Sequence, residues 1–385
     1  MKILYIKLHC GYSDTWTYQE NVLTTKFAQM GHETHIAVST RTTDCNRNTI
    51  IQSPREYINE FGVYVHMLPF SKHFYSLSRK FDYFDTLYDL MERIHPDFIF
   101  SHGVQYASLL TVAKYKKCHP EVKLVADNHG DQVIMPVDNI KRKIVHKIIY
   151  KYFVMRSDKF IDKYYGVSPS RGQYLTDVYG VSPDKIGIIP QVGDDTTANR
   201  YNHLEERELL CEKYHLDKHK IILIFGAGNI DAKKNLIPLV EAVEENPKYE
   251  LVVFGSFRVD VQKSFEKHQG SSNIHYIGLL LGNDIYRTII GSDLAIYPGQ
   301  HSVLWDNTVA CGTPLCVRKW AGMDYFDVNG NCRYISDGTK KEIKGLLEDL
   351  LVDDRIEAMR ASAQGDAKRH FSATEIAKLL LNQAE

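Results

Sequence analysis

Short apolar runs alternate with amphipathic segments along the first half of the chain. The runs are nearly continuous stretches of aliphatic and aromatic residues, which is typical of parallel strands buried on both faces. We expect strands at residues 2–8, 33–39, 63–68, 97–101, 123–126, 165–168 and 186–190. Apolar residues recur at helical spacing between them, and we expect helices at residues 18–30, 83–94 and 106–116. This alternation predicts a parallel sheet with helices on both faces.

A second set of the same kind begins near residue 220. We expect its strands at residues 220–225, 251–255, 274–278, 293–297 and 315–318. We expect its helices at residues 236–244, 260–268, 284–290, 341–351 and 372–381. Residues 191–219 are polar and charged, and we interpret them as a linker.

The two sets predict an α/β protein of two Rossmann-like domains, at residues 1–195 and 196–370, that face one another across a cleft. A C-terminal helix at 371–385 is expected to pack back on the first domain. Ligands of open parallel sheets bind at the carboxyl ends of the strands, and substrates often bind between domains. The loops that follow the strands are therefore the first place to look for a site.

Residues 297–314 give the clearest local signal for such a site. The strand that ends at Tyr297 is followed by the turn Pro298-Gly299, and Ser302 stands where the N-cap of the next helix belongs. The first N–H groups of a helix have no partner within it, and the helix dipole strengthens their attraction for anions. The pattern equally fits an ordinary strand-loop-helix step of a parallel sheet.

Composition narrows the classes of protein. The chain has 385 residues, of which 44% are hydrophobic and 25% charged, as expected for a soluble protein with sizeable cores. A net charge of -1 gives no support for nucleic-acid binding. The seven cysteines form no C-x-x-C pair, which argues against structural zinc and favours a reducing cytoplasm. No apolar run approaches the ~20 residues of a membrane span.

Residues 139–163 form a basic amphipathic segment. Its basic residues are Lys141, Arg142, Lys143, Lys147, Lys151, Arg156, Lys159 and Lys163. They alternate with isoleucine and aromatic residues, so the segment is a candidate for binding an anionic membrane surface. The alternative is a solvated helix whose apolar stripe packs on the sheet.

Glycines and lysines at residues 226–235 suggest a phosphate site. Gly226-Ala-Gly228 follows a strand, and Lys233-Lys234 precedes a helix. Glycine lets the backbone approach a phosphate, and lysine adds a point charge. The sequence has neither the full dinucleotide fingerprint nor a GxxxxGK[ST] loop, which argues against NAD-dependent and P-loop enzymes.

Several short segments carry a family resemblance. They are residues 125–129 (VADNH), 185–190 (KIGIIP), 234–242 (KNLIPLVEA), 252–255 (VVFG), 274–278 (IHYIG) and 309–314 (VACGTP). In order and spacing they resemble the GT-B glycosyltransferases, in particular the retaining family 4. The resemblance implies transfer of a sugar from a nucleotide-sugar donor with retention of configuration, without a metal or other cofactor.

Three departures from the family pattern concern the donor. The usual Glu-x7-Glu pair falls on Gly299 and Asn307, an arginine that commonly faces the diphosphate is replaced by Asn229, and the first loop lacks paired glycines. Asn307 could still bond a ribose hydroxyl, with Asp306 as a possible substitute.

The resemblance and the residue chemistry together give three sets of site residues. The donor-binding candidates are Gly228, Asn229, Lys233, Lys234, Gly255, Ile277, Gly278, Gly299, His301, Ser302, Asp306 and Asn307. The acceptor-side candidates are His9, Gly11, Trp16, Tyr18, Glu20 and His102. The catalytic candidates are His129 against the donor sugar, Asp131 as its orienting group or base, and Lys234 on the diphosphate. Each also has a structural alternative, such as a loop cap for His129 or a solvated surface for Lys233.

We therefore expect a cytoplasmic glycosyltransferase that acts on a hydroxyl of a saccharide or lipid-linked saccharide, in surface polysaccharide synthesis at the inner face of the membrane. Two alternatives remain open from the sequence. One is a catalytically degenerate module that binds a nucleotide sugar or a partner protein, and the other is a GT-B sugar-nucleotide epimerase.

Overall fold

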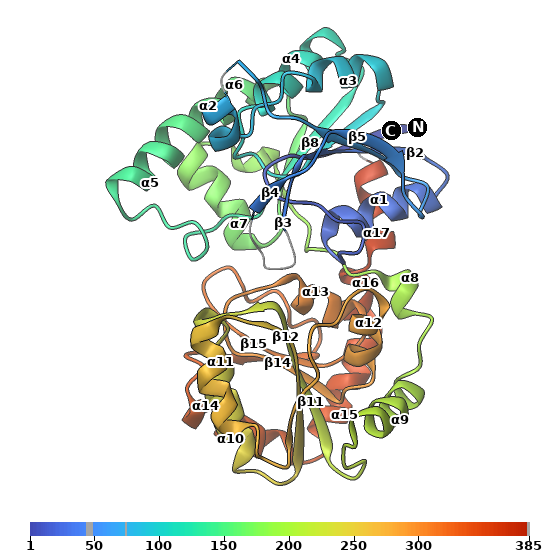
Figure 1. The fold of residues 1–385 in the computed structure, drawn as a ribbon, viewed down its shortest axis with the longest axis vertical. Coiled ribbons are helices and arrows are strands. Elements are labelled where there is room, and N and C mark those ends of the chain that lie inside the picture. Colours follow the sequence, from blue (N-terminus) through green and yellow to red (C-terminus); the bar gives the residue numbers. More distant parts are fainter. Residues whose placement is uncertain (44–48, 74, 383–385) are drawn as a thin grey trace. The chain divides into compact units, whose positions relative to one another are not determined.

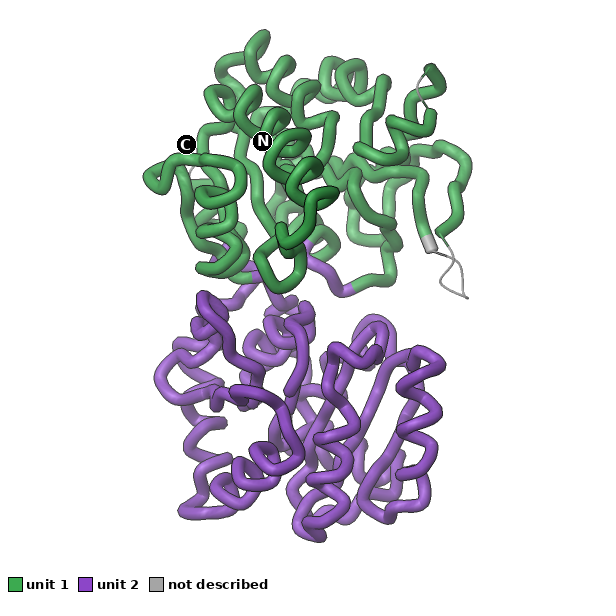
Figure 2. Tube along the Cα trace, turned by 90° about the vertical axis from the view of Figure 1, so that its left-hand side faces the viewer, with its two compact units in different colours: residues 1–16, 20–190, 377–385 green, residues 17–19, 191–376 purple. Residues whose placement is uncertain are grey.

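The computed structural model describes residues 1–43, 49–73 and 75–382 and divides into two compact units (Figure 2). Unit 1 comprises Met1–Trp16, Glu20–Pro190 and Ala377–Glu385, and unit 2 comprises Thr17–Gln19 and Gln191–Ile376. Cys45 lies outside the described residues, and the other six cysteines are free thiols. Within the described ranges, no helix has both the length and the apolar character needed to cross a bilayer.

Unit 1 is built on an eight-stranded sheet of order β10-β9-β8-β7-β1-β2-β6-β5. Its strands are β1 (Lys2–Lys7), β2 (Glu33–Ser39), β5 (Arg55–Ile58), β6 (Tyr64–Leu68), β7 (Phe98–Ser101), β8 (Lys123–Asn128), β9 (Lys163–Gly166) and β10 (Ile186–Ile188). Only β5 runs antiparallel to its neighbour in this sheet, so the predicted parallel arrangement is confirmed. β3 (Arg41–Thr43) and β4 (Thr49–Ile51) form a separate antiparallel pair.

Amphipathic helices cover both faces of this sheet (Figure 1). The helices of unit 1 are α1 (Gln19–Gln29), α2 (Tyr75–Phe81), α3 (Leu87–Ile94), α4 (Leu109–Cys118), α5 (Ile140–Ile144), α6 (Lys151–Ser157) and α7 (Pro169–Tyr174), of which α5 has no buried residue. In α3 the buried residues Leu87, Leu90, Met91 and Ile94 recur at helical spacing, and the helix ends at His95, whose φ is 52°. α3 and α4 lie on one face of the sheet and α1 on the other.

Unit 2 is built on a six-stranded parallel sheet of order β13-β12-β11-β14-β15-β16. Its strands are β11 (Ile221–Ile230), β12 (Tyr249–Phe257), β13 (Ile274–Tyr276), β14 (Leu294–Tyr297), β15 (Leu315–Arg318) and β16 (Cys332–Ile335). The sequence pattern did not predict β16. The helices of this half are α8 (Asp195–Ala198), α9 (His203–Tyr214), α10 (Leu236–Glu244), α11 (Val259–Phe265), α12 (Asn283–Ile290), α13 (Val303–Ala310), α14 (Lys340–Leu350), α15 (Arg355–Ser362) and α16 (Lys368–His370). The last helix, α17 (Ala373–Asn382), begins in unit 2 and belongs to unit 1 from Ala377 onward.

Residues 191–219 contain two helices, α8 and α9, which corrects their interpretation as a linker. The side chain of Asp194 accepts a hydrogen bond from the N–H of Thr197 at the start of α8, and Asn202 caps α9 in the same way. Leu210 and Cys211 of α9 are buried. The polar residues that suggested a linker are thus the caps and the outer face of two helices.

The glycine stretch after residue 225 is also different from the expected loop, because β11 continues through it to Ile230. A Cβ at Gly226 would lie 2.1 Å from Cζ of Phe254 on the neighbouring strand. Glycine is needed here for close packing inside the sheet rather than for a turn. A register shift between Ala227 and Asn229 marks a bulge near the end of the strand.

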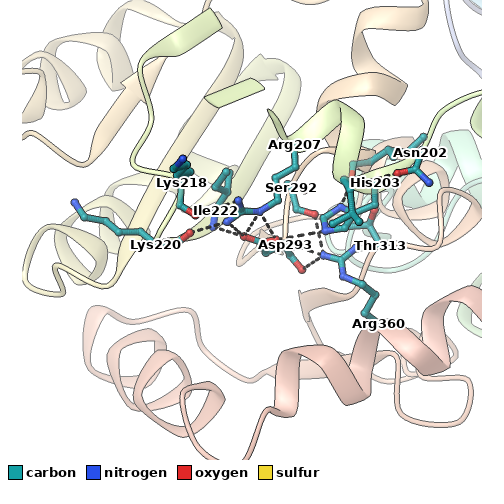
Figure 3. Close-up of polar contacts among 12 residues, drawn as sticks. Asn202, His203, Arg207, Lys218, Lys220, Ile222, Ser292, Asp293, Thr313 and Arg360 are labelled. Atoms are coloured by element: carbon teal, nitrogen blue, oxygen red, sulfur yellow. Dashed lines mark hydrogen bonds and ion pairs between the residues drawn. The ribbon is translucent and has the colours of Figure 1, made fainter. Parts of the chain in front are cut away.

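One carboxylate, Asp293, joins α9 to the amino end of the sheet in unit 2 (Figure 3). Its Oδ1 accepts a hydrogen bond from Nε of Arg207 at 2.9 Å, and its Oδ2 accepts one from the N–H of Ile222 at 2.8 Å. Nη2 of Arg360 donates to the carbonyls of Ser292 and Asp293 at 3.0 and 2.9 Å. A largely buried anion between two arginines stabilises the fold only while all partners are present.

We therefore expect Asp293→Ala to lower the free energy of unfolding by about 3 kcal/mol, because it leaves two half-buried guanidinium groups without a carboxylate partner. The measurement is urea unfolding followed by circular dichroism. Asp349→Ala is the matched control, since its ion pair with Arg355 joins side chains that are 49% and 36% exposed. The control should lose less than about 1 kcal/mol, and equal losses in the two variants would contradict the role of Asp293.

Candidate functional site

Polar side chains of unit 1 gather where neighbouring strands end. His9 follows β1, His102 follows β7, Asp127 lies near the end of β8, and His129 follows β8 directly. Because β8, β7 and β1 are adjacent in the sheet, their carboxyl ends lie side by side. The structure thus brings together three histidines that the sequence pattern suggested separately. We call His9, His102, Asp127 and His129 the histidine cluster.

Asp127 is the centre of the histidine cluster. Its Oδ2 lies 2.9 Å from Nε2 of His129 and 3.3 Å from Nδ1 of His102, and its Oδ1 accepts a hydrogen bond from the N–H of Gly103 at 2.6 Å. The hydroxyl of Tyr5 lies 2.9 Å from the same Nδ1 of His102. Asp127 has no exposed surface, so these groups replace its hydration.

Sequence reasoning did not select Asp127, although it stands two residues before His129. Side chains at i and i+2 of an extended segment point to the same side, and this spacing was the signal that could have identified it. Its contacts fix the orientation of the His129 ring.

The ring of His102 stacks on that of His9 and contacts that of His129 at a tilt. The ring centres of His9 and His102 are 5.4 Å apart, and those of His102 and His129 are 4.3 Å apart. Gly103 has a φ of 86°, and a Cβ there would lie 3.0 Å from Cε1 of His9. Glycine at this position therefore permits both the turn after β7 and the stacking.

The pKa values of the cluster diverge. Burial lowers the pKa of His129 to about 4, although Asp127 acts in the opposite direction. Burial also lowers the pKa of His9 to about 4, and the nearby His102 adds to this effect. Asp127 outweighs burial at His102 and raises its pKa. Near neutral pH, His9 and His129 are therefore uncharged imidazoles, which can exchange hydrogen bonds with a sugar hydroxyl.

The remaining acceptor-side candidates divide into buried and accessible groups. Glu20 is 2% exposed and forms a buried ion pair with Lys7, which outweighs burial and lowers the pKa of Glu20. This corrects the expectation that Glu20 meets an acceptor. Nζ of Lys7 also donates to the carbonyl of Gly11 at 2.6 Å and lies 5.6 Å from the ring centre of Trp16. Tyr18 is 39% exposed and lies in the short segment grouped with unit 2.

Asp131 has a different role from the expected one. Its Oδ1 accepts hydrogen bonds from the N–H groups two and three residues later, at 2.9 and 2.8 Å, and its Oδ2 lies 3.6 Å from Nε of the buried Arg171. These contacts hold the turn after β8. The contact with His129 that we expected from Asp131 comes from Asp127 instead.

Among the described residues, His102, Asp127 and His129 form a group that could hold a metal ion, because their ligand atoms lie within 4.8 Å of one another. The same atoms bond to one another and to Tyr5, which supplies the polar partners they need without an ion. The absence of a metal requirement stays a prediction.

In unit 2, Lys234 connects two segments that are distant in sequence. Its Nζ donates to the carbonyls of Gln300 and His301 at 3.0 and 3.4 Å, and burial lowers its pKa. α13 begins two residues after this loop, with Ser302 at the N-cap position that the sequence predicted. A lysine ammonium and the N-terminus of a helix therefore lie in the same region, which suits an anion.

Gly299 packs tightly within this loop. A Cβ at this residue would lie 2.4 Å from backbone atoms of Lys233 and Lys234. A glutamate therefore has no room at the position where the Glu-x7-Glu pattern places its first acid. The departure from the family pattern has a steric cause.

The residues at the other end of that pattern lie inside the fold. Asp306 and Asn307 have no exposed surface. Oδ2 of Asp306 lies 2.8 Å from Nε2 of His301, which is 8% exposed, and Oδ1 of Asn307 accepts a hydrogen bond from the hydroxyl of Tyr286 at 3.5 Å. The ribose and sugar contacts expected of Asp306 and Asn307 are not available in this conformation.

The other donor-binding candidates lie along one edge of the unit 2 sheet. Gly228 is exposed and Asn229 half-buried at the end of β11, while Lys233 is exposed beyond it. The N–H of Gly255 donates to the carbonyl of Gly278 at 2.8 Å, next to the half-buried Ile277. Since β13, β12, β11 and β14 are successive neighbours, these residues lie at the carboxyl ends of adjacent strands, as Gly299 does.

Known proteins share the fold described above. Residues 22–194 match the family described as Glycosyltransferase Family 4. HepE from Anabaena, solved in complex with UDP and glucose, has a TM-score of 0.72 at 12% identity over 100% of this chain and 99% of that one. The chain has the GT-B fold, and its first half is similar to Glycosyltransferase Family 4.

Other solved structures share its fold. Sucrose-phosphate synthase from Thermosynechococcus elongatus has a TM-score of 0.71 at 14% identity, covering 99% of this chain and 97% of that one. WaaG, a glycosyltransferase involved in lipopolysaccharide biosynthesis, has a TM-score of 0.61 at 13% identity, covering 99% and 98%. No curated protein matches the sequence of this GT-B chain.

We expect Gly299→Ala to destabilise unit 2 by about 1–3 kcal/mol, because the added methyl collides with backbone that cannot move away cheaply. Urea unfolding measures the loss. Gly345→Ala is the control, since no atom lies within 4 Å of a Cβ built there. The control should be neutral or stabilising, and an unchanged stability of Gly299→Ala would refute the steric argument.

The free energy of unfolding should decrease as the pH is lowered from about 6.5 to about 4. The folded pKa values of His9 and His129 are about 4, and the unfolded value is about 6.5, so the unfolded chain binds more protons in this window. The raised pKa of His102 has its effect above this window, where the contribution of His102 to the free energy of unfolding is lost as the pH rises.

The variant that tests this pH dependence is His129→Asn, which should remove on the order of 2 kcal/mol of the decrease, as measured by urea unfolding at several pH values. His219→Asn, at an exposed residue, should keep the dependence of the unaltered protein. The same slope in both variants would count against the neutral His129.

Proposed function

We propose that the chain transfers a sugar from a UDP-sugar to a hydroxyl of a saccharide or lipid-linked saccharide, with retention of configuration. The observation that carries the proposal is the position of Lys234 beside the loop that leads into α13. A cation and the first N–H groups of a helix in one region suit the charge of a diphosphate. UDP is the proposed nucleotide because HepE, which shares the fold, binds UDP and UDP-glucose.

Breaking the bond between the sugar and the diphosphate develops negative charge on the leaving group. Lys234 and the first N–H groups of α13 stabilise that charge, which is the task that a metal ion performs in other transferases. The burial of Asp306 against His301 keeps its carboxylate away from the phosphates and so avoids repulsion.

The histidine cluster supplies the second part of the proposed mechanism. His129, uncharged at neutral pH and held by Asp127, serves as a hydrogen-bond partner for a hydroxyl of the transferred sugar. Because Asp127 is ionised and fully buried, it fixes the imidazole without meeting the substrate. Trp16 and His9 belong to the acceptor side in this proposal.

We also propose that the protein works at the inner face of a membrane in surface polysaccharide synthesis. Lys141, Arg142, Lys143 and Lys147 are exposed on the segment from α5 onward, and Ile144 on the same segment is 45% exposed. A basic and apolar surface of this kind suits an anionic bilayer. WaaG, of the same fold, takes part in lipopolysaccharide biosynthesis.

A second candidate function is a nucleotide-sugar-binding module without transferase activity. It is favoured by one observation, that the residues of the family's acidic pair are a buried asparagine and a glycine with no space for a side chain. Binding without turnover toward any acceptor would identify it.

Lys234→Ala should weaken the affinity for UDP and UDP-glucose about tenfold or more and reduce donor turnover, because it removes a charged phosphate partner and releases the loop before α13. The measurement is isothermal titration calorimetry without added metal, with GDP, ADP and their sugars for comparison. Lys233→Ala is the control, since Lys233 is exposed and should change affinity less than twofold.

Unchanged affinity and turnover in Lys234→Ala would refute the diphosphate assignment. If the unaltered protein and both variants bind none of the nucleotides tested, the nucleotide-sugar proposal as a whole is refuted.

A further inference from the structure

A groove of about 590 Å³ lies between α4 and α6 on the helical layer of unit 1. Its polar lining is mostly basic, and it comprises Lys114, Lys117, Arg156, Lys159, Tyr152 and Asp158. Leu110 and Met155 add apolar surface. α4 and α6 lie side by side in unit 1 (Figure 1), and the groove is formed by helices rather than by the strand ends that carry the histidine cluster.

The positive charge of the groove is largely unneutralised. Its one carboxylate, Asp158, has Oδ1 3.2 Å from Nζ of Lys185, so this charge already has a partner. Within the described part of the chain, none of the four basic residues forms an ion pair with a carboxylate. All four are exposed, and the ammonium group of Lys114 lies 4.6 Å from the ring centre of Tyr88. Four cations around one hollow attract a phosphate group.

An exposed apolar stripe leads into the groove. Ile140, Ile144, Ile148, Tyr152 and Met155 are 78, 45, 62, 55 and 37% exposed. They recur at intervals of four, four, four and three residues along α5, the π-helical segment Val145–Tyr150 and α6, so they share one helix face. Tyr152 and Met155 belong to both the stripe and the groove.

Packing on the sheet accounts for only part of the apolar residues in the basic amphipathic segment. Its apolar residues were candidates for packing on the sheet, but these five face solvent while Val154 is fully buried. An apolar stripe beside a basic groove matches the chemistry of a phospholipid, whose phosphate is anionic and whose acyl chains are apolar.

We propose that this groove binds the phosphate headgroup of an anionic phospholipid while the apolar stripe enters the acyl boundary of the bilayer. The inference deepens the proposed membrane attachment and rests on it. It assigns the main contact to α4 and the end of α6, whereas the basic residues 141–147 supply only general attraction to the surface. Charge complementarity and the continuity of stripe and groove favour a lipid over a soluble phosphate.

The test is flotation of the full chain with phosphatidylcholine vesicles that contain or lack phosphatidylglycerol. A groove variant, with Lys114, Lys117, Arg156 and Lys159 each changed to Gln, should bind the anionic vesicles about tenfold or more weakly. The charge-matched control changes the exposed Lys213, Lys218, Lys263 and Lys267 of unit 2 to Gln, and it should bind within about twofold of the unaltered protein.

Two further arms separate the sources of the effect. Ile144→Ser/Ile148→Ser should weaken vesicle binding with the groove charges intact, and glycerol phosphate in solution should compete only weakly. Strong competition by glycerol phosphate, with no effect of the isoleucine variant, would show a site for soluble phosphates and overturn the lipid assignment. Equal vesicle binding by the groove variant and its control would overturn the groove.

Failure of the groove can be distinguished from failure of the membrane proposal. A third variant, with Lys141, Arg142, Lys143 and Lys147 changed to Gln, tests general attraction, and weaker binding in that variant alone would refute the groove but keep the membrane surface. No binding of the unaltered protein to anionic vesicles would refute both. UDP-glucose binding measured on each variant should be unchanged, which shows that the donor site is intact.

Discussion

The contact between Lys234 and the loop before α13 is the interaction on which the proposed donor site depends. A lysine ammonium that loses hydration needs other partners, and the carbonyls of Gln300 and His301 provide them. The contact brings the two backbones so close that residue 299 has no space for a side chain. The loop is thereby fixed directly before the first N–H groups of α13, which the proposal assigns to the diphosphate.

This arrangement changes the charge balance that the family pattern suggests. The position of the first acid is a glycine for steric reasons, and the carboxylate of Asp306, one residue before the position of the second acid, is turned into the core against His301. In the region where we place the diphosphate, neither position of the acidic pair therefore contributes a negative charge. A site with less negative charge needs less positive charge to hold a diphosphate, which is consistent with Asn229 in place of an arginine.

In unit 1 the polar groups are brought together by the topology of the sheet. Parallel strands all end at the same edge, so residues that follow β1, β7 and β8 meet without any local sequence relation. Asp127, buried beneath two imidazoles, separates their pKa values and orients His129. The basic groove of the same unit lies on its helices, so attachment and sugar chemistry are assigned to separate surfaces.

The sequence by itself determined the two parallel sheets, the bounds of α10 and β15, and the N-cap at Ser302, because hydrophobic periodicity and capping are local properties. It could also select His129 and Lys234 by resemblance. Tertiary structure decided what the neighbours of these residues are. It gave the orienting contact to Asp127 rather than Asp131, buried Glu20, Asp306 and Asn307, and kept the glycines after residue 225 within a strand. Burial and hydrogen-bond partners depend on segments that are distant in sequence, and no local pattern contains that information.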